Sequence, residues 1–259
     1  MSSNRCRRWG RRASFTEAVA FRTAFTGAMH TQQTASTITT QEIPPIMANP
    51  SLHQAYRPLL GGAALASAKA AIILVHGRGG DAENMMDLGL AVADDDIALV
   101  ALRAANNTWY PERFMAPIAQ NEPWLSSALQ SVSDAVDLVI AAGIQREYLM
   151  LMGFSQGACL SMEFAARNAT RYGAVVGLSG GLIGPDGTPR DYAGSLAGTP
   201  VFLGCSDRDP HIPVERVNES ATMLTALGGE IDARIYGGMG HIIIDDEINA
   251  VRALVGNLS

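Results

Sequence analysis

A serine between two glycines is the clearest candidate for chemistry in this sequence. Residues 153–157 read Gly-Phe-Ser-Gln-Gly, directly after the apolar segment Tyr148–Met152 and before a segment of helical character that starts at Ala158. In a strand-to-helix turn the glycines remove side chains that would clash, and the serine hydroxyl lies at the edge of the sheet beside a helix N-terminus. The pattern predicts that Ser155 is a nucleophile. An ordinary tight turn is the alternative.

A serine hydroxyl needs a base, and the base needs an acid that orients it. His241 follows a later apolar segment, and the ordinary pKa of a histidine, about 6.5, suits a general base. The other four histidines lie in or near the N-terminal region, at the end of the first strand, or in the loop that carries the acid. That acid is Asp207 or Asp209; Pro210 fixes the backbone directly after Asp209, which favours Asp209. A surface histidine is the alternative for His241.

The glycine-rich turn at residues 77–81 is the candidate for stabilising negative charge on a reacting oxygen. Such a turn can direct a main-chain N–H at an oxyanion, together with the N–H of the residue that follows the nucleophile. We therefore expect the main-chain N–H groups of Arg78 and Gln156 to form the oxyanion hole.

Aromatic residues gather in the segment between residues 106 and 124, close to the expected active edge. We expect four of them to form a wall for an acyl or aromatic substrate: Trp109, Tyr110, Phe114 and Trp124. A packed structural loop is the equal alternative. The segment Gly180–Gly198, rich in glycine and proline, is either a small flap over the site or a surface loop.

The elements that must position these residues alternate between short apolar runs and segments of helical period. This pattern predicts a mostly parallel sheet with helices on both faces, an α/β fold. In such a sheet the loops after the strands meet at one edge, which brings serine, acid and histidine together. The expected strands are Ala71–His76, Ile97–Leu102, Tyr148–Gly153, Ala174–Ser179, Pro200–Cys205 and Glu230–Tyr236. One helix is expected after residue 81, containing Met85, Met86 and Leu88, and others near 121–143, 158–168, 213–228 and 244–258.

The composition fits one domain preceded by a basic extension. The 259 residues carry a net charge of -6, but residues 1–50 hold six Arg against two Glu, while residues 51–259 hold 13 basic and 23 acidic groups. We expect 1–50 to be a disordered extension or a mis-assigned start, and 51–259 to be the functional domain. The acidic balance argues against a nucleic-acid partner. The three cysteines are not spaced in pairs, which argues against a disulfide scaffold or a zinc site. No apolar run is long enough to span a membrane, which favours a cytoplasmic protein without integral membrane contact.

From about residue 56 onward the chain resembles the carboxylesterase, lysophospholipase and acyl-protein thioesterase branch of the α/β-hydrolase superfamily. The matching stretches, in order, are His76-Gly77, residues 153–157, Gly177-Leu178-Ser179-Gly180, Asp209-Pro210-x-Ile212-Pro213 and Gly240-His241. The resemblance implies an α/β-hydrolase fold with little or no lid, a Ser155, His241 and Asp209 triad, an acyl-enzyme intermediate, no metal and no cofactor. It also favours Asp209 over Asp207, because the family's acid precedes the proline.

The substrate implied by the resemblance is a small ester, thioester or lysophospholipid; a homodimer is left open. Relatives commonly carry an apolar residue in place of Arg78, so the guanidinium is expected in the pocket, where it favours acidic or polar acyl groups. Two alternatives remain. One is a non-catalytic binding module on the same fold. The other is a nucleotide-binding oxidoreductase, because residues 77–82 read Gly-x-Gly-x-x-Ala; however, Arg103 follows the second strand, where that pattern requires an acid.

Overall fold

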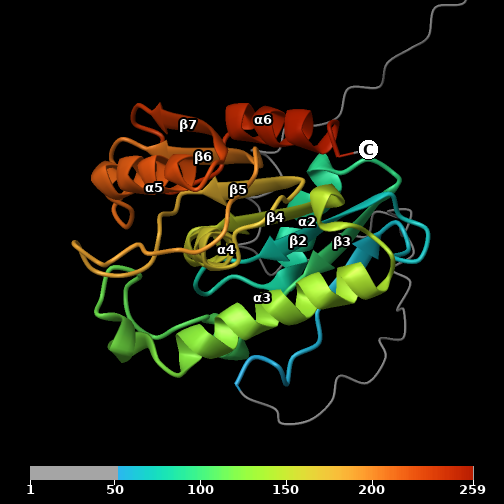
Figure 1. Cartoon of the computed structure of the whole chain (residues 1–259), viewed down its shortest axis with the longest axis horizontal. Helices are drawn as coiled ribbons and strands as arrows, with labels where there is room; N and C mark the ends of the chain where they lie inside the picture. Colours follow the sequence, from blue (N-terminus) through green and yellow to red (C-terminus); the bar gives the residue numbers. More distant parts are fainter. Residues whose placement is uncertain (1–51, 259) are drawn as a thin grey trace, which may run out of the picture. The chain divides into compact units, whose positions relative to one another are not determined.

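The computed structural model describes residues 52–258, whose centre is a seven-stranded sheet. The strands lie in the order β1-β3-β2-β4-β5-β6-β7 (Figure 1). All neighbouring pairs are parallel except β1 and β3, which are antiparallel. The extension expected over residues 1–50 lies outside the described residues. The strands are β1 Leu59–Gly62, β2 Ala70–Val75, β3 Ile97–Ala101, β4 Leu149–Phe154, β5 Ala174–Leu178, β6 Pro200–Ser206 and β7 Glu230–Tyr236.

The six predicted strands are all present, and each end lies within one residue of its expected position. Strands β2, β3 and β5 are buried at every residue, as expected of parallel strands covered on both faces. The seventh strand, β1, was not predicted. It has four residues, two of them glycine, and is only half-buried, so it lacks the apolar run that marks the others.

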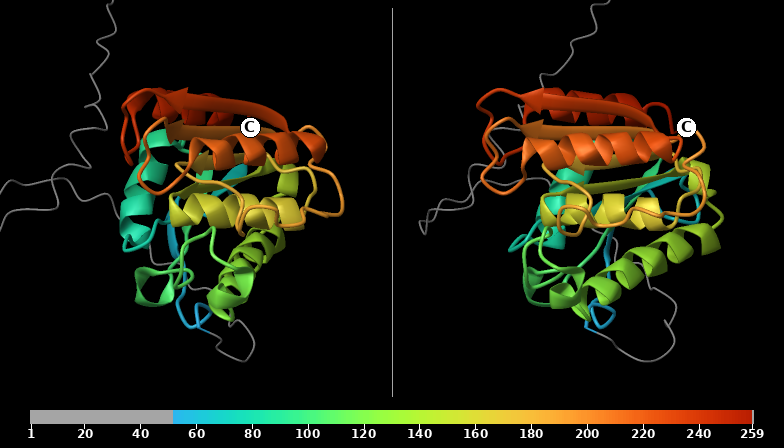
Figure 2. Two further views of the ribbon diagram at one scale, coloured as in Figure 1. Left: turned by 90° about the vertical axis from the view of Figure 1, so that its left-hand side faces the viewer. Right: turned by 60° about the vertical axis from the view of Figure 1, so that its left-hand side comes forward.

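Helices cover both faces of this sheet (Figure 2). Helices α3, α4 and α5 lie on one face, while α2 and α6 lie against each other on the opposite face. The predicted α/β class is therefore confirmed. Within residues 52–258, no helix combines the length and hydropathy that crossing a bilayer requires. The helices are α2 Ala82–Val92, α3 Trp124–Ala141, α4 Gln156–Arg167, α5 Val214–Ala226 and α6 Asp245–Val255.

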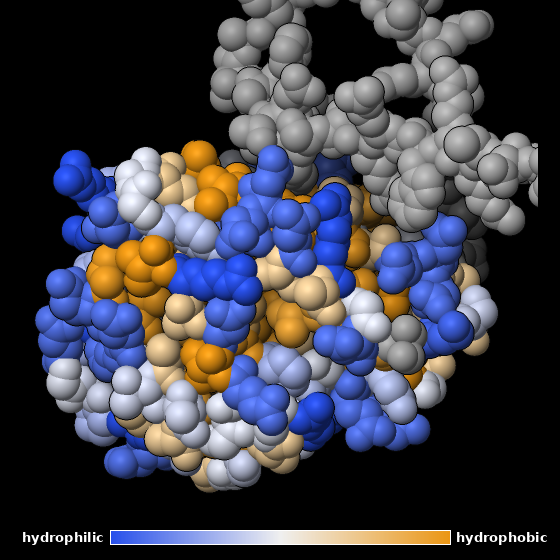
Figure 3. All heavy atoms as spheres, turned by 90° about the horizontal axis from the view of Figure 1, so that it is seen from above, coloured by the Kyte–Doolittle hydropathy of each residue, from blue (hydrophilic) through white to orange (hydrophobic). Residues whose placement is uncertain are grey.

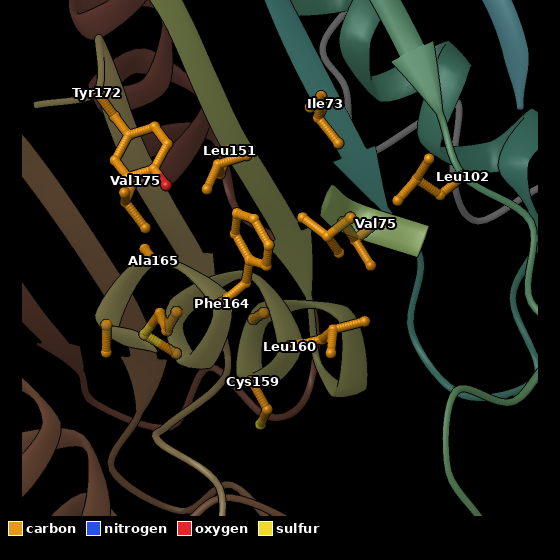
Figure 4. Close-up of a cluster of buried hydrophobic side chains, with 14 of the residues drawn as sticks. Ile73, Val75, Leu102, Leu151, Cys159, Leu160, Phe164, Ala165, Tyr172 and Val175 are labelled. Atoms are coloured by element: carbon orange, nitrogen blue, oxygen red, sulfur yellow. The ribbon is translucent and has the colours of Figure 1, made fainter. Parts of the chain in front are cut away.

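Helix α4 is the best buried of these helices, with every residue from Gln156 to Ala166 buried. Its Leu160 and Phe164 side chains point towards β2 and β4, and Figure 4 shows them beside Val75 and Leu151. A helix held on this much apolar surface has little freedom to move relative to the sheet. The residue that begins the helix is therefore held firmly as well.

Strands β2 and β4 lie side by side at the point where the chain changes direction across the sheet. From β2 the chain passes to β3 on one side, whereas from β4 it passes to β5 on the other. The loops after these two strands diverge and leave a crevice at the carboxyl edge, which is where open α/β sheets bind ligands. The Gly-rich turn at 77–80 and Ser155 both border this crevice.

Strand β7 forms the exposed edge of the sheet, beside α6. Figure 3 shows this side of the molecule, where hydrophilic residues separate small apolar areas. The guanidinium of Arg234 bonds the carboxylates of Asp232 and Asp246, and the neighbouring Ile235 is 38% exposed. Charged side chains on an edge strand disfavour pairing with another chain.

Glu247, in the first turn of α6, is a carboxyl group with no exposed surface. Its Oε2 accepts a hydrogen bond of 3.0 Å from the Ile244 main chain, and its Oε1 lies against Gly204 of β6 with no hydrogen-bond partner among the described residues. Burial, with a further contribution from the neighbouring Asp246 charge, raises the pKa of Glu247 to about 7.

We expect Glu247→Gln to relieve a pH-dependent destabilisation. At low pH this carboxyl is protonated in both the folded and the unfolded state, so it does not change the free energy of unfolding. Because its folded pKa exceeds its unfolded pKa, it lowers the free energy of unfolding as the pH rises from about 4.5 to 7. Between pH 4.5 and pH 8 the variant should therefore gain about 3 kcal/mol relative to the wild type. Urea unfolding at both pH values measures this. The same substitution at the exposed Glu215 is the control, and a difference that does not vary with pH would contradict the expectation.

Candidate active site

Ser155 occupies the sharp turn between β4 and α4. Its φ of 55° and ψ of -118° lie in a backbone region that residues with side chains rarely adopt. Two glycines make the turn possible, because a Cβ on Gly153 would overlap the carbonyl of Gly157, and one on Gly157 would overlap the carbonyl of Val75. The turn leaves the Ser155 side chain half-buried at the carboxyl edge of the sheet.

Ser155, His241 and Asp209 are joined by two short hydrogen bonds, although they lie far apart in the sequence. The Ser155 Oγ lies 2.8 Å from His241 Nε2, and His241 Nδ1 lies 2.6 Å from Asp209 Oδ2. A hydroxyl, an imidazole and a carboxylate in this order can move a proton off the hydroxyl as its oxygen attacks, while the carboxylate holds the imidazole in the required tautomer.

The carboxylate of Asp209 is completely buried at the far end of this chain of groups. Burial alone would raise its pKa, but the hydrogen bond from His241 and those from the main-chain N–H groups of His211 and Ile212 outweigh burial and lower it. Asp209 therefore remains a carboxylate near neutral pH. Asp207 instead accepts a hydrogen bond of 2.7 Å from the Gly238 main chain.

The turn after β2 lies directly against the serine turn. Gly80 N–H donates to Gly77 O at 3.0 Å, and a Cβ on Gly77 would lie 3.2 Å from the Ser155 Cβ. Among the described residues, the Arg78 main-chain N–H donates to no group. Gln156 begins α4, where the first N–H groups have no partner within the helix. Two free N–H groups thus flank the serine.

A cavity of about 370 Å³ opens at the serine. Its volume lies at the lower end of the range for small-molecule sites. The wall combines apolar, aromatic and charged groups from the loops after β2, β3, β4, β6 and β7. The lining residues are Gly77, Arg78, Tyr110, Pro111, Glu112, Arg113, Phe114, Phe154, Ser155, Gln156, Cys159, His211, Ile212 and His241.

Residues 63–257 match the sequence profile of the phospholipase/carboxylesterase family. The chain belongs to this family. The predicted resemblance is thus confirmed, and so is the α/β-hydrolase fold. Among solved structures, a phospholipase/carboxylesterase from Dyadobacter fermentans is 41% identical, with a TM-score of 0.75 over 77% of this chain and 95% of that one.

Curated relatives of this phospholipase/carboxylesterase chain include two fungal proteins named acyl-protein thioesterase 1. The protein from Gibberella zeae is 31% identical over 45% of this chain and 50% of its own length. The protein from Saccharomyces cerevisiae is 29% identical over 50% of this chain and 58% of its own length. The matches therefore span about half of each of these relatives.

Only two of the four aromatic residues expected in the cavity wall lie there. Tyr110 and Phe114 line the cavity, but Trp109 and Trp124 do not. Trp109 is fully buried and donates through Nε1 to the His76 carbonyl at 2.8 Å. Both tryptophans pack against the ring of His53, with centroids 5.3 and 5.5 Å away. They support the loop from behind, as the alternative of a packed structural loop describes.

His53 and His76 act as neutral structural groups behind the cavity of this hydrolase-fold domain. His53 Nδ1 accepts from Ala105 N–H at 3.0 Å, so its proton is on Nε2 and faces the carbonyl of Trp109 at 2.9 Å. His76 Nε2 likewise accepts from the main chain of Ala104. Burial lowers the pKa of both imidazoles. The neutral forms fit these hydrogen bonds, because each ring uses one nitrogen as an acceptor.

Arg78 and the segment 180–198 were also expected near the pocket. The Arg78 guanidinium lines the cavity but donates to main-chain carbonyls of the loop at 110–112. The segment 180–198 contributes no residue to the cavity lining. Within that segment Leu182 and Ile183 are fully buried, and Ile183 N–H donates to the buried Glu163 carboxylate at 3.0 Å. Residues 185–198 are exposed or half-buried except Leu196, so the segment is a surface loop anchored at its start rather than a flap over the cavity.

Several lining residues were missed by the sequence reasoning for this family member. His211 packs edge-on against His241, with ring centroids 4.9 Å apart, and Phe154 lies 5.1 Å from the same ring. Cys159, one helical turn after Ser155, also lines the cavity, and burial raises its pKa to about 12. The i to i+4 spacing on α4 was the only available signal for Cys159.

Proposed function

We propose that this chain is a serine hydrolase that cleaves carboxylic esters through an acyl-enzyme intermediate. The observation that carries the proposal is the pair of hydrogen bonds that joins Ser155 to His241 and His241 to Asp209, beside the cavity that Ser155 and His241 line. Membership of the phospholipase/carboxylesterase family supports the same reaction class.

In the proposed mechanism, Ser155 Oγ attacks the substrate carbonyl carbon while His241 Nε2 accepts the hydroxyl proton. The carbonyl oxygen becomes an oxyanion, which receives hydrogen bonds from the main-chain N–H groups of Arg78 and Gln156. His241 then donates the proton to the departing alkoxide, and the alcohol leaves. Water, deprotonated by the same imidazole, attacks the acyl-enzyme and releases the carboxylic acid. Asp209 remains ionised and orients His241 throughout.

The cavity favours short acyl groups. Its volume is about 370 Å³, it is open to solvent on one side, and its lining includes Phe114, Phe154 and Ile212 beside the polar serine turn. A pocket of this size holds a compact acyl or aromatic group better than a long alkyl chain. The relatives named acyl-protein thioesterase extend the proposal to thioesters, since the attacked carbonyl and the acyl-enzyme are the same and only the leaving group differs.

A chain-length series tests the proposal. We expect p-nitrophenyl acetate and butyrate to be hydrolysed with kcat/KM at least about 10-fold above the laurate ester, and the matching S-acyl thioesters to follow the same order. The rate should fall on acidification, because only a neutral imidazole accepts the serine proton. No hydrolysis of any ester or thioester would refute the proposed reaction, and a preference for laurate would refute the proposed size of the acyl group.

A further inference from the structure

Residues 109–112, of which Tyr110, Pro111 and Glu112 line the cavity, contain no helix or strand. Side chains bind their main-chain polar groups: His53 and Asn121 make one hydrogen bond each, and Gln156 and Arg78 make the other five. The Gln156 carboxamide accepts from Trp109 N–H at 2.9 Å through Oε1 and donates to Tyr110 O at 2.8 Å through Nε2. The Arg78 guanidinium donates to Tyr110 O at 2.9 Å, to Pro111 O at 2.8 Å and to Glu112 O at 2.7 Å. These five hydrogen bonds substitute for a strand partner.

Arg78 and Gln156 meet at the carbonyl oxygen of Tyr110, which accepts a hydrogen bond from each of them. They come from different elements, since Arg78 lies in the turn after β2 and Gln156 begins α4 after β4. Each of these residues also contributes one of the two main-chain N–H groups of the proposed oxyanion hole. The Tyr110 carbonyl therefore links the two turns that carry the donors.

The charge of Arg78 is held by neutral partners. Within residues 52–258 its guanidinium forms no ion pair, and three main-chain carbonyls receive its hydrogen bonds. By contrast, Arg103, at the end of β3, makes a two-point ion pair with Glu83. A planar guanidinium can bond several carbonyls at fixed angles, which the single ammonium of a lysine cannot do.

We propose that Arg78 and Gln156 are positioning residues for the oxyanion hole, in addition to the main-chain donors they provide. Their side chains act through the Tyr110 carbonyl to fix the distance between the turn after β2 and the start of α4. This inference rests on the proposed function. Two donors stabilise a tetrahedral oxyanion only when both lie about 3 Å from it, so a small separation of the turns weakens the transition state more than the bound ester.

The test uses Arg78→Met, Arg78→Lys, Gln156→Met and the double Met variant, assayed with p-nitrophenyl acetate in the full-length protein. Arg103→Met is the matched control, because it removes a guanidinium that lies outside the cavity lining. Each single Met variant should lose about 10- to 100-fold in kcat with KM changed by less than about 3-fold. Arg78→Lys should lie closer to Arg78→Met than to the wild type. Arg103→Met should keep the wild-type kcat.

The double variant measures the link through Tyr110. Because both side chains act on one carbonyl, the double variant should lose clearly less in kcat than the product of the two single losses. Thermal unfolding confirms that each variant is folded, and if Arg78→Met is unfolded the same comparison is made with Arg78→Lys. Unchanged kcat, a rise in KM alone, or losses that multiply would overturn the positioning role. A wild type that cleaves no ester would instead refute the proposed function.

Discussion

Replacing Ser155 with alanine is expected to lower kcat for p-nitrophenyl acetate by at least about 10⁴-fold. The variant lacks the only hydroxyl that hydrogen-bonds His241 Nε2 among the described residues, so no acyl-enzyme can form. What remains is the hydrolysis that substrate binding and the oxyanion donors support without a nucleophile. Steady-state kinetics on the purified variant measure the loss.

Ser161→Ala is the matched control for that experiment. Ser161 lies on the same helix, is fully buried, and within residues 52–258 its hydroxyl has no hydrogen-bond partner. Its removal should leave kcat within about 3-fold of the wild type, because the side chain touches neither the cavity nor the triad. If both variants retain the wild-type kcat, Ser155 is not the nucleophile.

Asp209→Asn is expected to reduce kcat by about 10³- to 10⁴-fold. The carboxamide has nearly the same shape, but it stabilises no positive charge on His241 and can present an N–H to Nδ1. That favours the tautomer in which Nε2 carries a proton and cannot accept one from Ser155. In the wild type Asp209 Oδ1 accepts hydrogen bonds from the main-chain N–H groups of His211 and Ile212, and the amide oxygen of the variant is expected to take that place, which directs its NH₂ group at His241.

Asp207→Asn separates the two candidate acids. Asp207 lies two residues earlier and bonds the Gly238 main chain rather than the imidazole. We expect its loss to lower kcat by less than about 10-fold, through a looser glycine turn before His241. The ratio of the two kcat values is the measurement. Equal losses, or a larger loss for Asp207→Asn, would show that Asp209 is not the orienting acid.

Most of the sheet could be predicted from the sequence because its strands are buried on both faces. A doubly buried strand such as β2 or β5 has an apolar residue or glycine at nearly every position, and that signal needs no partner to be read. Strand β1 is short, rich in glycine and half-buried. It becomes a strand only because it pairs with β3, so its sequence alone carries little information.

The residues of the candidate triad follow from chain order and sheet direction. Once β4, β6 and β7 are parallel, the loops after them must meet at one edge, and Ser155, Asp209 and His241 lie in those loops. The tertiary partners of the loops do not follow in this way. The size and apolar character of Trp109 and Trp124 predict that they are buried. Which neighbours they pack against depends on His53, which is distant in the sequence.

The contacts of the Arg78 side chain could not be predicted from the sequence either. Its neighbours in the chain indicate a glycine-rich turn, and an unusual charge there suggests contact with substrate. The structure instead places three carbonyls of residues 110–112 within hydrogen-bond distance of the guanidinium. Carbonyl acceptors are common to every residue type, so no sequence pattern marks them.

Covalent labelling tests most directly whether Ser155 is the nucleophile of a serine hydrolase. The wild type is incubated with a fluorophosphonate, and its intact mass and tryptic peptides are then measured. We predict one added phosphonyl group per chain, on Ser155, with parallel loss of esterase activity and no labelling of Ser155→Ala. A wild type that stays unlabelled while it hydrolyses esters, or a label on another residue that accounts for the lost activity, would contradict the claim.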